Sequence, residues 1–143
     1  METKNANGGA GFTEYNDGTI QFETTQWSQG YYDNGKIWQT FTLPEGKYEM
    51  RIEVKNAANI GSGSTNIHFA VAQGESLPDN EELEKSDIIL SYLKFESEHT
   101  NKTSALPIFE LTEEKTITVG WVVSFSDICR NIEFKSVRLW SVA

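Results

Sequence analysis

The feature that most constrains the fold of this chain is a strict alternation of apolar and polar side chains. Residues 47–55 place Tyr48, Met50, Ile52 and Val54 between charged residues. Residues 117–125 repeat the pattern with Ile117, Val119, Trp121, Val123 and Phe125. Successive side chains of a strand point to opposite faces, so a period of two predicts β-strands with one face on a core.

Weaker versions of the same pattern predict further strands at 19–24, 37–43, 65–73, 106–111 and 132–142. Residues 88–95 fit either a strand or a helix, and a short helical turn is expected over 79–85. The turn Leu43-Pro44-Glu45-Gly46 predicts a β-hairpin between 37–43 and 47–55. The last strand carries bulk on both faces, with Phe134 and Trp140 opposite Val137, which predicts a bulge or a covered outer face.

Seven or eight short strands without a long helical pattern predict an all-β fold, an antiparallel β-sandwich. The periodicity does not separate a jelly roll from an immunoglobulin-like topology, and the number and length of the strands favour the jelly roll. The length of 143 residues fits one domain. We expect a flexible leader or linker over the Gly- and Asn-rich residues 1–11, a single sandwich domain over 12–143, and loops at 26–36, 59–64 and 96–104.

The charge balance indicates which partners to exclude. Twelve basic and 21 acidic residues give a net charge of −9, which disfavours nucleic acid and anionic membranes. No apolar run reaches the roughly 20 residues that span a bilayer, so we expect no membrane insertion of this segment. Cys129 is the only cysteine, so no intrachain disulfide forms, and a buried thiol is expected.

The loop at 26–36 is the candidate ligand-binding site. Trp27, Tyr31 and Tyr32 offer flat apolar faces to the C–H side of a sugar ring, and the Asn34 amide supplies directed hydrogen bonds. In the alternative interpretation, Trp27 and one tyrosine fold back and cap the end of the sandwich. Trp38 lies on a predicted strand and is assigned to packing.

The sequence offers no catalytic residue, metal site or cofactor motif. It has no nucleophile elbow, no Cys/His cluster and no phosphate-binding glycine loop. Asp17 and Asp33 are oxygen ligands of the type that calcium prefers, but their spacing is not that of an EF-hand loop. His68 is interpreted as a structural strand residue.

Several blocks of the sequence resemble a known family. They are "NGKIWQTFTLPEGKYEMRIEV", "FAVAQGESLPD", "FELTEEKTITVGWVVSF" and "IEFKSVRLW". Over most of residues 15–142 the chain resembles an uncharacterised galactose-binding-like domain from the C-terminal end of Bacteroidetes surface lipoproteins that take part in glycan utilisation. The matching blocks are turns and core strands, so the resemblance assigns no binding residue.

The resemblance implies a jelly-roll sandwich, export to the bacterial outer-membrane surface or periplasm as part of a lipoprotein, and an accessory role in glycan capture. Two functions follow as hypotheses. The first is a non-catalytic carbohydrate-binding domain whose aromatic loop stacks a sugar, with a glycan as partner. The alternative is a structural or protein-interaction spacer without a small-molecule ligand. It would contact neighbouring domains of the parent lipoprotein and expose an apolar patch around Trp140.

Overall fold

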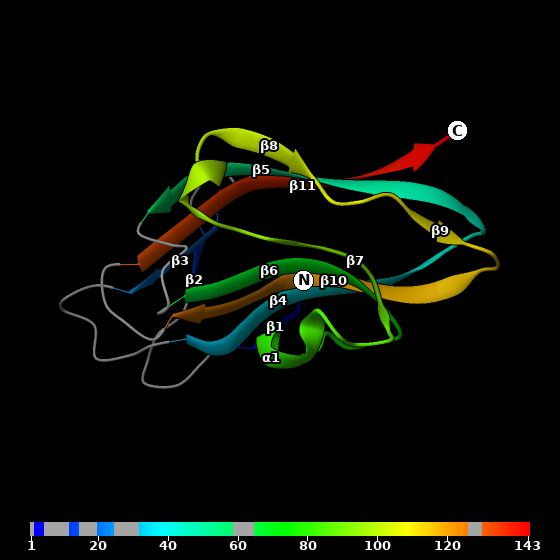
Figure 1. Cartoon of the computed structure of the whole chain (residues 1–143), viewed down its shortest axis with the longest axis horizontal. Helices are drawn as coiled ribbons and strands as arrows, with labels where there is room; N and C mark the ends of the chain where they lie inside the picture. The colour runs from blue at the N-terminus through cyan, green and yellow to red at the C-terminus, as the bar shows by residue number, and fades with distance from the viewer. Residues whose placement is uncertain (1, 5–11, 15–19, 25–31, 59–64, 126–129) are drawn as a thin grey trace.

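The computed structural model describes residues 2–4, 12–14, 20–24, 32–58, 65–125 and 130–143, with the side chains of 33–57, 65–125 and 131–143. Figure 1 shows two layers of strands. Sheet A contains, in spatial order, β1 (Glu2–Lys4), β4 (Tyr32–Leu43), β10 (Lys115–Phe125), β6 (Thr65–Gln73) and β7 (Ile89–Lys94). Sheet B contains β2 (Phe12–Glu14), β3 (Ile20–Thr24), β11 (Arg130–Val142), β5 (Gly46–Ala58) and β8 (Lys102–Ala105), and β9 (Phe109–Leu111) also pairs with β5. The strand pairs are antiparallel, which confirms the predicted sandwich.

The core lies between the two sheets and uses the apolar faces that the alternation predicted. From β5 it receives Tyr48, Met50, Ile52 and Val54, and from β10 Ile117, Val119, Trp121, Val123 and Phe125. Trp121 is central: the centroid of its ring lies 5.3 Å from that of Phe69, 4.8 Å from that of Phe95 and 4.7 Å from that of Phe134. Aromatic packing of this kind joins both layers.

The predicted hairpin between β4 and β5 is wrong, although both strands exist. β4 pairs with β1 and β10 in sheet A, whereas β5 pairs with β11, β8 and β9 in sheet B. The turn at Pro44 and Glu45 therefore carries the chain from one sheet to the other, and the Tyr48 hydroxyl donates a hydrogen bond to the Pro44 carbonyl oxygen at 2.8 Å. An apolar face looks the same in a hairpin and across a sandwich, so alternation could not distinguish the two arrangements.

Other segments differ from the predictions where long-range pairing overrides local composition. Glu2–Lys4, inside the expected leader, forms β1 on the edge of β4. β4 begins at Tyr32, inside the expected loop 26–36, because Tyr32 and Gly35 pair with Phe125 and Val123 of β10. β8 and the short 3₁₀-helix η1 (Ser97–His99) occupy the expected loop 96–104. The remaining parts of the expected leader, of loop 26–36 and of loop 59–64 lie outside the described residues, as does Cys129.

The structure also defines the two segments whose secondary structure was uncertain or short, and the irregular last strand. Residues 88–95 form strand β7, and the short helical turn is α1 (Asn80–Leu83). The predicted bulge is present in β11, where the register with β5 shifts around Phe134 and again before Ser136. The shift turns Phe134 into the core, on the same side as Val137. It explains how bulk occurs at both parities of this strand.

The two outer faces of the sandwich differ. The outer face of sheet A is covered by the segment 74–88 with α1, which buries Leu77 and Leu83 against Ala70 and Val122. Trp38 packs against this cluster, which confirms its assignment to packing. The outer face of sheet B instead exposes side chains of β5 and β11. In the described part of the chain, no helix has the length and apolar character needed to cross a membrane.

Candidate functional site

The exposed face of sheet B brings together outward side chains from three strands. The register of β5 with β11 sets which of these side chains are neighbours. Trp140 lies opposite Glu49, Arg138 opposite Arg51 and Ser136 opposite Glu53. On the other side of β5, Thr103 of β8 lies opposite Glu53. Residues far apart in the sequence are therefore neighbours on one surface.

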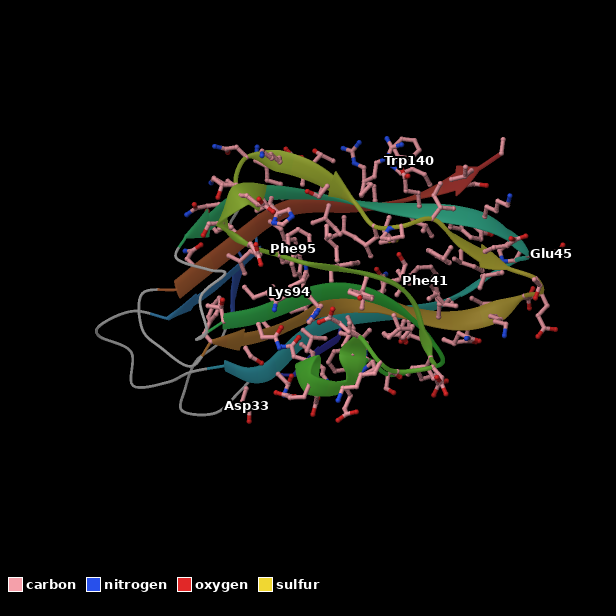
Figure 2. The ribbon with its side chains drawn as sticks, viewed as in Figure 1. Asp33, Phe41, Glu45, Lys94, Phe95 and Trp140 are labelled. Atoms are coloured by element: carbon pink, nitrogen blue, oxygen red, sulfur yellow. The ribbon has the colours of Figure 1, made fainter. Side chains whose placement is uncertain are left out.

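Trp140 is an exposed aromatic residue of this face. Its side chain lies on the outer side of sheet B, the upper layer in Figure 2, and the residue is 45% exposed. The guanidinium carbon of Arg51 lies 5.4 Å from the centroid of the Trp140 ring, and Arg51 Nε donates to Glu49 Oε1 at 2.6 Å. The Glu49 carboxylate holds Arg51, Arg51 packs over the Trp140 ring, and the exposed part of the ring remains open to a ligand.

One hollow adjoins this ring, and a second shares Glu53 and Thr103 with the first. The first has a volume of about 170 Å³ and is lined by Arg51, Glu53, Thr103, Ser136, Arg138 and Trp140. The second has a volume of about 260 Å³ and is lined by Glu53, Val54, Lys55, Asn101, Lys102, Thr103 and Lys135. We call the two together the outer groove.

The outer groove combines one aromatic face with hydrogen-bonding groups of every type. Arg138 donates, Glu53 accepts, and the hydroxyls of Thr103 and Ser136 do both. The Ser136 hydroxyl lies 3.4 Å from Glu53 Oε1 and donates to it. Such a surface can stack an apolar ring face and bind hydroxyl groups around it.

A further hollow of about 260 Å³ lies between the sheets, where β4 and β11 face each other. Its lining includes the core side chains of Phe69, Trp121 and Phe134, together with Lys135 and Ser136 at the β11 side. The lining is mostly apolar and belongs to the core, so the outer groove is the better candidate for a polar ligand.

The residues predicted from the sequence lie at a different place, where β4 begins. Trp27 and Tyr31 lie outside the described residues, as does the side chain of Tyr32, whose backbone pairs with Phe125. Asn34 is buried, with 7% of its surface exposed and a φ of 58°. Asparagine tolerates this left-handed conformation better than most residues. Its contribution to binding stays a prediction, and the structure shows what its side chain contacts.

The Asn34 amide belongs to a buried polar network that fastens α1 to sheet A. Its Oδ1 accepts from the Asn80 backbone N–H at 2.7 Å, and its Nδ2 donates to Asp33 Oδ1 and Glu81 Oε2, each at 3.2 Å. Lys36, two residues along β4, donates to the Leu77 carbonyl oxygen at 2.8 Å and pairs with Asp79 at 2.7 Å. The beginning of β4 therefore holds the segment 74–88 in place.

His68 is the buried centre of the same network. Asn80 Nδ2 donates to the Asn66 carbonyl oxygen and to Ser124 Oγ, each at 2.8 Å, so Asn80 Oδ1 faces His68 Nδ1, also at 2.8 Å. With its Oδ1 facing the ring, Asn80 accepts, and His68 Nδ1 donates. His68 Nε2 lies 3.3 Å from Glu84 Oε2. The ring is fully buried and anchored through Nδ1, as expected of a structural strand residue, whereas Nε2 has no hydrogen-bond partner among the described residues.

Glu84 also controls the ionisation of Tyr92. The hydrogen bond that Tyr92 donates to Glu84, then the carboxylate charge and then burial raise the Tyr92 pKa above 10.0. The folded chain therefore keeps the Tyr92 proton that the unfolded chain releases near pH 10. The stability that this proton contributes is present below about pH 10 and is lost as the pH rises through the folded pKa.

We expect this loss of stability above about pH 10 to be smaller in Tyr92→Phe. In Glu84→Gln, the tyrosinate absorbance of Tyr92 should appear at lower pH, because the neutral amide does not oppose the phenolate charge. Urea unfolding at alkaline pH measures the change in stability. An ultraviolet titration, from which the titration of Tyr92→Phe is subtracted, measures the ionisation of Tyr92. An unchanged titration in Glu84→Gln would contradict the assignment.

No group of three or more His, Cys, Asp or Glu side chains that suits a metal ion occurs among the residues with described positions. Asp33 is exposed and accepts from Asn34, and Asp17 lies outside the described residues.

Sequence reasoning missed the outer groove. The charged positions of residues 47–55 alternate like any solvent-facing side of a strand, and nothing in that stretch identifies a partner strand. The one available signal was the bulky aromatic Trp140 on the outer parity of the last strand. Only the pairing of β5 with β11 places it beside Arg51.

The fold is shared with known carbohydrate-binding modules. The xylan-binding module CBM15 superposes with a TM-score of 0.54 at 13% identity, covering 99% of this chain and 90% of that chain. The module TmCBM61, solved in complex with β-1,4-galactotriose, gives a TM-score of 0.51 at 12% identity, covering 99% and 88%. These likenesses show the jelly-roll, galactose-binding-like fold class that was predicted.

The same fold occurs in other settings. A chain of the complex of accessory secretory proteins 1, 2 and 3 from Streptococcus pneumoniae gives a TM-score of 0.51 at 7% identity, covering 94% of this chain and 91% of that chain. No curated protein sequence matches this chain. A family model described as "Domain of unknown function (DUF5013)" matches residues 1–120 of the 143, so the chain belongs to the DUF5013 family.

Proposed function

We propose that this chain is a non-catalytic carbohydrate-binding domain and that the outer groove binds the sugar. The observation that carries the proposal is Trp140, an exposed ring held by Arg51 beside a groove lined with hydroxyl, carboxylate and guanidinium groups. The fold of the xylan-binding module and of the galactotriose-bound module supports it.

In the proposed binding mode, the apolar face of one sugar ring stacks on Trp140. The hydroxyl groups of the sugar replace their hydrogen bonds to water with hydrogen bonds to the side chains of the groove. Stacking supplies the apolar contact, while Glu53 and Arg138 fix the orientation of the ring by accepting and donating hydrogen bonds. From Trp140 to Lys135 the groove follows β11 for about 17 Å at the usual strand rise. This length exceeds one sugar ring and suits a short oligosaccharide.

Replacing Trp140 by alanine tests the proposal. Removing an aromatic anchor costs more than about tenfold in affinity, so we expect at least that loss for the oligosaccharide that binds best among xylo- and β-1,4-galacto-oligosaccharides in isothermal titration calorimetry. Ile108→Ala is the matched control, because Ile108 is a large exposed apolar residue (53%) that does not line the outer groove. Equal binding by Trp140→Ala and the parent would reject the groove as the site.

The aromatic residues at and before the start of β4 are the second proposed location. Trp27, Tyr31 and Tyr32 have the chemistry for stacking, and Asn34 follows them in the sequence and belongs to the polar network that holds α1. The same titrations on Trp27→Ala and Tyr31→Ala separate the two locations. If these variants lose binding while Trp140→Ala does not, the sugar binds at the end of the sandwich.

The proposed absence of catalysis is supported by the spacing of the two acids that border Trp140 and the groove. Glu49 and Glu53 are four residues apart on β5, which separates their Cα atoms by about 13 Å at the strand rise, and the Glu49 carboxylate is engaged by Arg51. Paired carboxylates in glycosidases lie about 5–9.5 Å apart. We expect no release of reducing ends from any glycan that binds, and such release would contradict the proposal.

A spacer that contacts neighbouring protein domains is the alternative function, and exposed Trp140 favours it equally. It would leave every glycan titration silent.

We also propose that the chain is exported as part of a bacterial lipoprotein at the outer-membrane surface or in the periplasm, as the family resemblance suggests. Fractionation and lipid labelling of the parent protein test this location.

A further inference from the structure

The outer groove has a charge opposite to that of the whole chain. The chain has a net charge of −9, yet five of its twelve basic residues line this groove: Arg51, Lys55, Lys102, Lys135 and Arg138. Among the groove-lining residues, Glu53 is the acid that faces them, and Glu49 is already paired with Arg51. The groove is therefore a local positive surface on an acidic protein.

Most of this positive charge is uncompensated. Within the described ranges, Lys55, Lys102, Lys135 and Arg138 have no ion-pair partner. All four are exposed. Lys55, Lys102 and Lys135 line one hollow, although they come from three different strands. Their charges are thus available to a ligand that reaches the groove.

The arrangement also has an internal cost. Arg138 of β11 lies directly opposite Arg51 of β5, and like charges that face each other across a strand pair destabilise a sheet. Only Arg51 has a carboxylate partner, Glu49. An anion bound between the strands would relieve the repulsion, whereas a neutral ligand would leave it.

We infer that the outer groove takes an acidic saccharide, whose carboxylate or sulfate group pairs with Arg138 and the lysines while a ring of the same saccharide stacks on Trp140. This inference rests on the proposed carbohydrate-binding function. A guanidinium binds a carboxylate or sulfate through two parallel hydrogen bonds. The acids elsewhere on the surface disfavour long polyanions such as DNA, which extend beyond the groove.

The test compares polygalacturonate fragments with the same fragments after reduction of their carboxyl groups, so that only the ligand charge changes. We expect the parent chain to bind the acidic form at least about fivefold more tightly in low salt, since exposed ion pairs contribute up to about fivefold each. The double variant Lys102→Gln/Lys135→Gln should lose most of this preference and keep its affinity for the reduced form, because both lysines line the groove but neither is assigned a contact with the neutral sugar. Lys85→Gln/Lys94→Gln, which removes the same charge from exposed sites outside the groove, should keep the preference.

Short oligosaccharides of dextran sulfate and chondroitin sulfate, titrated in parallel, distinguish sulfate from carboxylate as the preferred group, and tighter binding of either supports the inference. Equal binding of acidic and reduced fragments would overturn it and leave the carbohydrate-binding function standing. Silence with every saccharide would overturn both. Binding of double-stranded DNA as tight as that of the best saccharide would also overturn it, because the groove would then recognise charge alone.

Discussion

Replacing Gly120 by alanine should destabilise the fold by at least about 3 kcal/mol, the largest effect of a single methyl group that we expect in this chain. Gly120 lies in β10 directly opposite Trp38 of β4. A Cβ at this position would overlap the Ile37 carbonyl oxygen and lie 2.8 Å from the Trp38 Cα. Both obstacles are backbone atoms, so the new methyl group fits only if two central strands of sheet A move apart.

Urea unfolding of the purified variant measures this loss, and the midpoint should fall or the transition should disappear. Thr116→Ala is the control on the same strand, because the Thr116 side chain is exposed and its described hydrogen bond is a long 3.4 Å contact with the Thr42 hydroxyl. It should change the free energy of unfolding by about 0.5 kcal/mol or less. A Gly120→Ala variant as stable as the control would show that the close approach of β4 and β10 is not as described.

Replacing Asn80 by alanine should cost about 3 kcal/mol, because the buried His68 Nδ1 loses its partner and two half-buried groups each lose a hydrogen bond. Asn80 is buried, and its side chain contacts His68 Nδ1, the Asn66 carbonyl oxygen and Ser124 Oγ, each at 2.8 Å. The orphaned His68 Nδ1 costs about 1–3 kcal/mol, and each of the other two lost hydrogen bonds costs about 0.5–1.5 kcal/mol, although Ser124 Oγ still accepts from the Asn34 backbone N–H. The segment 74–88 should also become sensitive to proteases, since the Asn80 side chain fastens α1 to β6 and β10.

Glu82→Ala, an exposed substitution in the same short helix, is the matched control and should be nearly neutral. Limited proteolysis followed by mass spectrometry locates the first cleavage, which we expect within 74–88 in Asn80→Ala only. If both variants unfold at the same urea concentration, the polar network does not stabilise this face.

Both substitutions act on sheet A, whereas the outer groove lies on sheet B. Where the Asn80→Ala variant is still folded, its affinity for a saccharide should equal that of the parent. The stability and the binding predictions are therefore separable, because sites that share no partner act nearly independently.

The sequence by itself determined which faces of the strands are buried. The alternation at Tyr48 to Val54 and at Ile117 to Phe125 identified the core sides of β5 and β10, and residues 65–73 became β6 with the predicted bounds. The bulge in the last strand was also readable, because bulk at both parities cannot fit one uninterrupted pleat. These properties are local: they follow from the two-residue period of any strand and need no knowledge of its neighbours.

Only the tertiary structure decided which strands pair, and with them the location of the outer groove. Local patterning cannot choose between a hairpin and a crossing from sheet A to sheet B, so β4 and β5 were joined wrongly. β8 was missed because Lys102–Ala105 has no apolar face and becomes a strand only by pairing with β5. Trp140, Arg138, Arg51 and Thr103 become neighbours through the same long-range register. The hydrogen-bonded ladder between distant segments forms when the two layers close over the core, and this closure is a property of the whole chain.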